Sequence, residues 1–127
     1  MMTPFIHFIE EVERYRLDAP IINYDDYRTH CNGCGSKGGV KFPDTMWGVD
    51  IEAACNIHDI GWARAKTYED LVEANEVFDN NLKKIVDAES NSFTVWFRRM
   101  RVAKYVSAVE LKGTDTYAKE NNLMKRG

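Results

Sequence analysis

The sequence of 127 residues has no apolar run near the roughly 18 residues that a membrane-spanning helix needs. It also lacks any block of about five like charges, which excludes the usual signature of a disordered charged tail. The formal net charge is −3, so no global excess of positive charge favours nucleic acid as a partner. We therefore expect a soluble chain with no transmembrane segment and no nucleic-acid partner.

Cysteine and proline are also scarce, with three of each. Three cysteines are too few for the disulfide framework of a small secreted domain, but they leave room for one bridge or one metal site. Residues 1–16, MMTPFIHFIEEVERYR, lack the positively charged leader of a secretory signal. We expect the chain to be cytoplasmic as synthesised unless it is exported by another route.

Helical periodicity is what the sequence does contain. At 44% hydrophobic and 29% charged residues, the composition suits one globular domain spanning residues 1–127. Apolar residues recur at helical spacing in four segments, whereas residues 20–48 hold most of the glycines without a regular period. We expect a mainly α fold with a long glycine-rich loop, an N-terminal helix, two antiparallel central helices and a long C-terminal helix. The helices are expected at residues 4–16, 51–66, 67–88 and 92–113.

Two polar residues are predicted to face inward from the central helices. His58 lies in the apolar stripe of the first of them, between Cys55 and Trp62. On the next helix the predicted stripe includes Asn75, and Asp79 stands seven residues from both Val72 and Val86, which places its carboxylate on their face. A carboxylate that orients an imidazole leaves the second ring nitrogen to take a proton from water. The pattern therefore predicts acid–base chemistry at His58 with Asp79.

Asp59 points about 100° away from His58 around the helix, toward the glycine-rich loop if that loop packs over the helix. A carboxylate together with backbone carbonyls suits a hard cation such as calcium, and glycines let a loop turn several carbonyls inward. Asp59 is therefore a candidate metal ligand.

The segments GCGSKGG at residues 33–39 and DIEAACNIHD at residues 50–59 together resemble the phospholipase A2 superfamily. Members of that family join a calcium loop, X-C-G-x-G-G, to a helix with D-x-C-C-x-x-H-D, and supply a second aspartate from the next helix. The resemblance covers roughly residues 28–87. It implies calcium-dependent hydrolysis of the sn-2 ester of a glycerophospholipid at a membrane surface, by a water that histidine activates, and hence a role in lipid degradation.

The resemblance also implies roles for individual residues. His58 is the general base, Asp79 its orienting carboxylate and Asp59 the charged calcium ligand. Gly35 supplies an oxyanion N–H. The carbonyls that complete the calcium site come from Gly33, Gly35 and Gly38, with Lys37 as the alternative third ligand, and a family disulfide corresponds to Cys34 with Cys55.

Two other interpretations stay open. Cys31, Cys34, Cys55 and His58 have the ligand types and spacing of a structural Cys3His zinc site in a binding or scaffold protein. In the other interpretation, the chain has the phospholipase A2-like fold but no catalytic activity, and it is a lipid-binding domain. In that case a mixture of basic and aromatic residues on the last helix suits an anionic membrane surface: Arg98, Arg99, Arg101 and Lys104 with Phe93, Trp96 and Phe97.

Overall fold

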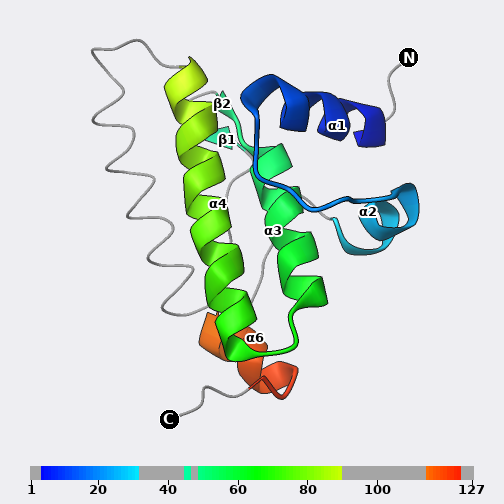
Figure 1. Cartoon of the computed structure of the whole chain (residues 1–127), viewed down its shortest axis with the longest axis vertical. Helices are drawn as coiled ribbons and strands as arrows, with labels where there is room; N and C mark the ends of the chain where they lie inside the picture. Colours follow the sequence, from blue (N-terminus) through cyan, green and yellow to red (C-terminus); the bar gives the residue numbers. More distant parts are fainter. Residues whose placement is uncertain (1–3, 32–44, 47–48, 90–113, 124–127) are drawn as a thin grey trace.

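The structure is a computed structural model that describes residues 4–31, 45–46, 49–89 and 114–123 (Figure 1). Within these residues the fold is mainly helical, which confirms that part of the prediction. The helices are α1 (Pro4–Tyr15), α2 (Tyr24–His30), α3 (Glu52–Arg64), α4 (Tyr68–Glu89) and α6 (Thr114–Glu120). The short strands β1 (Thr45–Met46) and β2 (Val49–Asp50) pair antiparallel.

The segment predicted as a continuous loop, residues 20–48, contains helix α2, so the prediction is wrong there. The Asn23 side chain accepts a hydrogen bond from the backbone N–H of Asp26 at 2.8 Å and caps this helix. At seven residues, α2 is too short to show a helical period in the sequence. The helix predicted at residues 92–113 lies outside the described residues.

Side-chain hydrogen bonds precede α3 and cap α4. The N-cap residue of α3 is Ile51, which makes no side-chain cap bond, but the predicted capping residue Asp50 lies directly before it. Asp50 Oδ1 accepts the backbone N–H of Glu52, the first residue of α3, at 2.9 Å. At the start of α4, Thr67 Oγ1 accepts the N–H of Asp70 at 3.1 Å, and Asp70 Oδ2 accepts the N–H of Thr67 at 3.2 Å. This reciprocal pair is a capping box with aspartate in the place of the usual glutamate.

Helix α4 returns alongside α3 in the opposite direction after a short turn (Figure 1). Their crossing is close because Gly61 on α3 faces Ala74 on α4: a Cβ atom added to Gly61 would lie 2.9 Å from the Cβ of Ala74. Apolar side chains of both helices fill the main core, to which α1 adds Phe8. The buried members from α3 and α4 are Ala53, Ala54, Cys55, Ile57, Ile60, Phe78, Leu82, Ile85 and Val86.

Further contacts fix the periphery to this helix pair. Asn81 of α4 is fully buried and holds the backbone of Asp18 through two hydrogen bonds, at 2.8 and 2.9 Å. Helix α6 lies against α4 near the turn between the central helices (Figure 1), and buries Ala118 beside Trp62 and Leu71. None of the helices in the described residues is apolar over enough of its length to cross a bilayer.

Candidate functional site

His58 lies in the middle of α3 with 5% of its surface exposed. Its ring contacts two aromatic rings, Trp62 one turn later on α3 and Phe78 on α4, with centroid distances of 4.6 and 4.7 Å. His58 Nε2 lies 2.7 Å from Oδ1 of Asn75, a buried residue of α4. The aromatic contacts and this hydrogen bond hold the imidazole in one orientation.

The chemistry of its neighbours determines which ring nitrogen of His58 carries the proton. Trp62 Nε1 lies 3.1 Å from Asn75 Oδ1, and an indole N–H is only a donor, so the oxygen of the Asn75 amide must face Trp62. The same oxygen faces His58 Nε2, which therefore donates. Neutral His58 is thus the Nε2–H tautomer, and its basic lone pair is on Nδ1.

Asp79 does not orient His58, so that prediction is wrong. Its Oδ2 pairs with Lys83 Nζ at 2.9 Å, and its buried Oδ1 has no hydrogen-bond partner in the described part of the chain. The side chain of Asp79 is 25% exposed at the edge of the packed face. The reason is the position of Asn75, one helical turn earlier, which is the turn of α4 that meets His58.

The same asparagine connects the site to α6. Asn75 Nδ2 donates to Thr114 Oγ1 at 2.8 Å, and Thr114 is 1% exposed. Neither Asn75 nor Thr114 is among the predicted site residues. Asn75 had a signal, since it is a polar residue on the predicted apolar stripe of α4. Thr114 had none, because it belongs to no periodic pattern.

Asp59, the predicted metal ligand, is 2% exposed and belongs to α3 directly after His58. Burial and, secondly, the negative charge of Asp59 raise the pKa of the Tyr117 phenol on α6. A buried carboxylate is a hard oxygen donor and fits a calcium ion chemically. The described residues contain no group of three or more acidic, histidine or cysteine ligands, so further ligands would have to come from elsewhere in the chain.

The predicted loop partners of Asp59 lie outside the described residues: Gly33, Gly35, Lys37 and Gly38. Their proposed roles as calcium ligands, and that of Gly35 as oxyanion donor, stay predictions.

The cysteines weigh against the zinc alternative. Cys55 is disulfide-bonded, so its sulfur is not available as the thiolate that a Cys3His site needs. Cys31 keeps its thiol, which donates to the backbone carbonyl of Asn56 at 3.4 Å. The family resemblance pairs Cys55 with Cys34, which lies outside the described residues, and this pairing stays a prediction.

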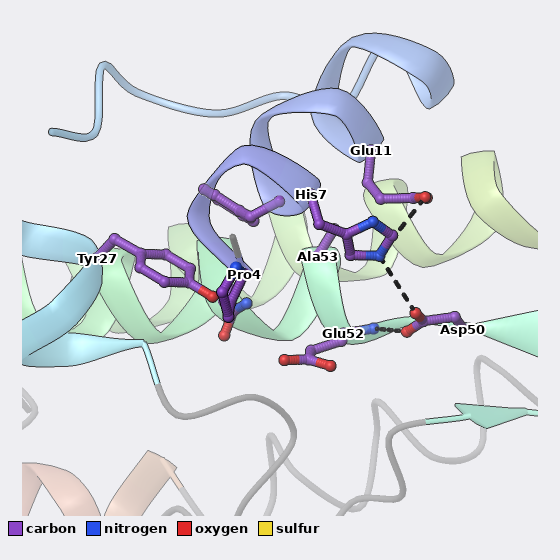
Figure 2. Close-up of a pocket in the computed structure, with 9 residues that line it drawn as sticks. Pro4, His7, Glu11, Tyr27, Asp50, Glu52 and Ala53 are labelled. Carbon is purple, nitrogen blue, oxygen red and sulfur yellow. Dashed lines mark hydrogen bonds and ion pairs between the residues drawn. The ribbon is translucent and has the colours of Figure 1, made fainter. Parts of the chain in front are cut away.

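A separate cavity of about 450 Å³ is bordered by α1, α2, β2 and the first turns of α3 (Figure 2). His7 Nε2 lies 3.8 Å from Glu11 and 3.9 Å from Asp50 at this cavity. Its α3 wall includes Asn56, about 160° around the helix from His58 at 100° per residue. The cavity therefore lies on the far side of α3 from the imidazole.

The arrangement around His58 can accept a proton at Nδ1 while Nε2 is held by a neutral amide. Comparison of the chain with models of protein families, with curated proteins and with solved structures finds no match.

Proposed function

We propose that this protein is a hydrolase of the phospholipase A2 type, which cleaves the sn-2 ester of glycerophospholipids at a membrane surface. The observation that carries the proposal is the fixed Nε2–H tautomer of His58, which Asn75 Oδ1 holds at 2.7 Å. This tautomer makes Nδ1 the base that removes a proton from an attacking water. An imidazole in a buried polar network beside a buried carboxylate, Asp59, is the arrangement that such chemistry needs.

In this proposal Asn75 takes the orienting role that the resemblance gives to an aspartate. An amide oxygen fixes the ring as a carboxylate does, but it stabilises the imidazolium less because it has no charge. Asp59 would supply the charge of a calcium site that the carbonyls of Gly33, Gly35 and Gly38 complete. A calcium ion held there would supply Lewis-acid polarisation of the ester carbonyl and positive charge for the phosphate.

The test is fatty-acid release from mixed phospholipid vesicles, with calcium and with a chelator. We expect release from the parent in calcium and little in chelator. His58→Gln should lower the rate by about 100-fold or more, the usual cost of losing a general base. The matched control is His7→Gln, which removes a half-exposed histidine on α1 and should leave the rate unchanged.

Two results would count against the proposal. The first is release from His58→Gln within a few-fold of the parent, which would remove the imidazole from the mechanism. The second is a parent that binds no calcium at millimolar concentration, because no cation would then polarise the ester carbonyl.

A second candidate function is favoured by one observation, the neutral side chain at the position of the orienting carboxylate. A lipid-binding domain of the same fold needs His58 and Asn75 only as parts of a satisfied buried network. Sedimentation with anionic vesicles, measured beside the release assay, separates the two. Binding without release in calcium favours the lipid-binding domain.

A further inference from the structure

We infer that Thr114, the first residue of α6, is a positioning residue that holds Asn75 in the orientation required by His58. The inference rests on the proposed function for its activity readout, but it concerns a residue outside the motifs that suggest that function. Thr114 is separated from Asn75 by 39 residues and joins it through a hydrogen bond of 2.8 Å between buried side chains.

The amide of Asn75 has two ends, and each end has a dedicated partner. Its oxygen accepts from His58 Nε2 and Trp62 Nε1 at 2.7 and 3.1 Å, and its nitrogen donates to Thr114 Oγ1. A flipped amide would turn its N–H groups toward the indole N–H, and no acceptor would face Trp62. Trp62 therefore selects the orientation, and Thr114 satisfies the amide N–H that this orientation leaves buried.

The orientation of Asn75 in turn decides the tautomer of His58. With Oδ1 toward the ring, Nε2 must donate and Nδ1 is the base. With Nδ2 toward the ring, Nε2 must accept, and the basic lone pair moves to the nitrogen that faces the amide. The Thr114 hydroxyl can donate as well as accept, so it does not choose between the two orientations of the amide. It anchors the amide in the orientation that Trp62 selects, and its loss loosens the acceptor that holds the Nε2–H tautomer of His58.

Three contacts hold α6 where Thr114 can reach Asn75. The ring of Tyr117 lies 4.7 Å from that of Trp62, and its hydroxyl donates to the Trp62 carbonyl at 3.3 Å. Tyr68 on α4 donates to Asp115 Oδ1 at 2.8 Å. Because these contacts reach both central helices, α6 is fixed against the pair that carries the site.

The experiment uses Thr114→Val, which replaces the hydroxyl with a methyl group of similar size. Nitrogen NMR on labelled full-length protein reports the tautomer of His58 from the couplings of each ring nitrogen to the ring protons. We expect the Nε2–H form to dominate in the parent and to fall to a mixture in Thr114→Val, with fatty-acid release lowered about ten-fold or more. Thr114→Ser, which restores the hydroxyl, should recover both.

Thr116→Val is the matched control, because it removes the same group from a partly exposed position of α6. It should leave the tautomer and the rate as in the parent. A pure Nε2–H signal in Thr114→Val would overturn the inference. If the parent releases no fatty acid, the proposed function fails, but the tautomer still tests the role of Thr114.

A measurement on the parent covers the case in which Thr114→Val does not fold. The side-chain amide protons of Asn75 should exchange slowly with solvent and show contacts to the Thr114 side chain. Fast exchange, or the absence of those contacts, would overturn the inference without any variant.

Discussion

At the scale of single residues, the main feature is that a neutral amide, Asn75, occupies the position beside His58 where the resemblance to the phospholipase A2 superfamily predicts a carboxylate. Asn75 satisfies His58, Trp62 and Thr114 at once, so the network is complete without charge. A complete neutral network inside a core costs less free energy than a buried charge. The price is a weaker stabilisation of the imidazolium.

Replacing Asn75 with aspartate tests whether a buried charge would stabilise the imidazolium at the expense of the stability of the fold. The carboxylate can accept from His58 and Trp62 with one oxygen, and the Thr114 hydroxyl can rotate to donate to the other. We expect Asn75→Asp to raise the rate of fatty-acid release by about ten-fold, because a carboxylate beside the ring favours the charged form by about one pKa unit or more. The cost is a lower free energy of unfolding, measured by urea denaturation. A rate equal to or below that of the parent would show that proton transfer to His58 is not limiting.

Some positions at this site can be predicted from the sequence, and others cannot. The inward position of His58 and the capping box of Thr67 and Asp70 follow from helical spacing and cap chemistry. The face assigned to Asp79 was defined by Val72 and Val86. Val86 is buried in the structure, but Val72 is 39% exposed, so this face is only partly turned toward the core. Helix α4 has 22 residues, and residues one turn apart on it, such as Asn75 and Asp79, point in similar directions. A small error in the angle of the buried stripe is therefore enough to select the wrong one of the two.

At the scale of elements, the crossing of α3 and α4 sets the distance between His58 and Asn75. The crossing depends on Gly61, whose missing side chain lets the two backbones approach at Ala74. Short spacing between the helices is what lets a side chain as short as asparagine reach the ring across the interface.

We expect Gly61→Ala to destabilise the protein by about 1–3 kcal/mol, the usual cost of overpacking a close contact. Urea denaturation measures this change. The double variant Gly61→Ala with Ala74→Gly moves the methyl group to the other helix and should recover most of the loss. If Gly61→Ala alone is as stable as the parent, the helices separate easily and the crossing does not fix the site.

The elements missed from the sequence are the short ones. Helices α2 and α6 have seven residues each, about two turns, which is too few for an apolar period to repeat. Packing rather than propensity decides helices of this length. The predicted ranges of the long helices α3 and α4 agree with the structure to within two residues at each end, because their apolar stripes repeat over several turns and a capping box marks the start of α4.

At the scale of the whole molecule, four tyrosines link its stability to alkaline pH. Burial is the main cause that raises the pKa of Tyr15, Tyr27 and Tyr117, and the hydrogen bond to Asp115 is the main cause for Tyr68. A raised pKa in the folded state means that the unfolded chain loses these protons first as the pH rises past about 10. The contribution to stability is therefore full below that pH and is lost as the pH rises through the folded values.

We expect the free energy of unfolding to fall steadily above pH 10, with tyrosine absorbance near 295 nm rising later in the folded protein than in urea. Tyr117→Phe should make this fall shallower, because it removes one of the linked groups. Coincident titration curves for the folded and unfolded protein would contradict the prediction.

The hydrogen bond between Asn75 and Thr114 also has a consequence for the order of events during synthesis. Helices α3 and α4 leave the ribosome before α6, and the two partners are 39 residues apart in the chain. The central helix pair can fold while the nitrogen of the Asn75 amide still lacks its hydroxyl partner. The network around the imidazole is therefore complete only when Thr114 has emerged, so a nascent chain that carries both central helices does not yet hold the anchored Asn75 amide.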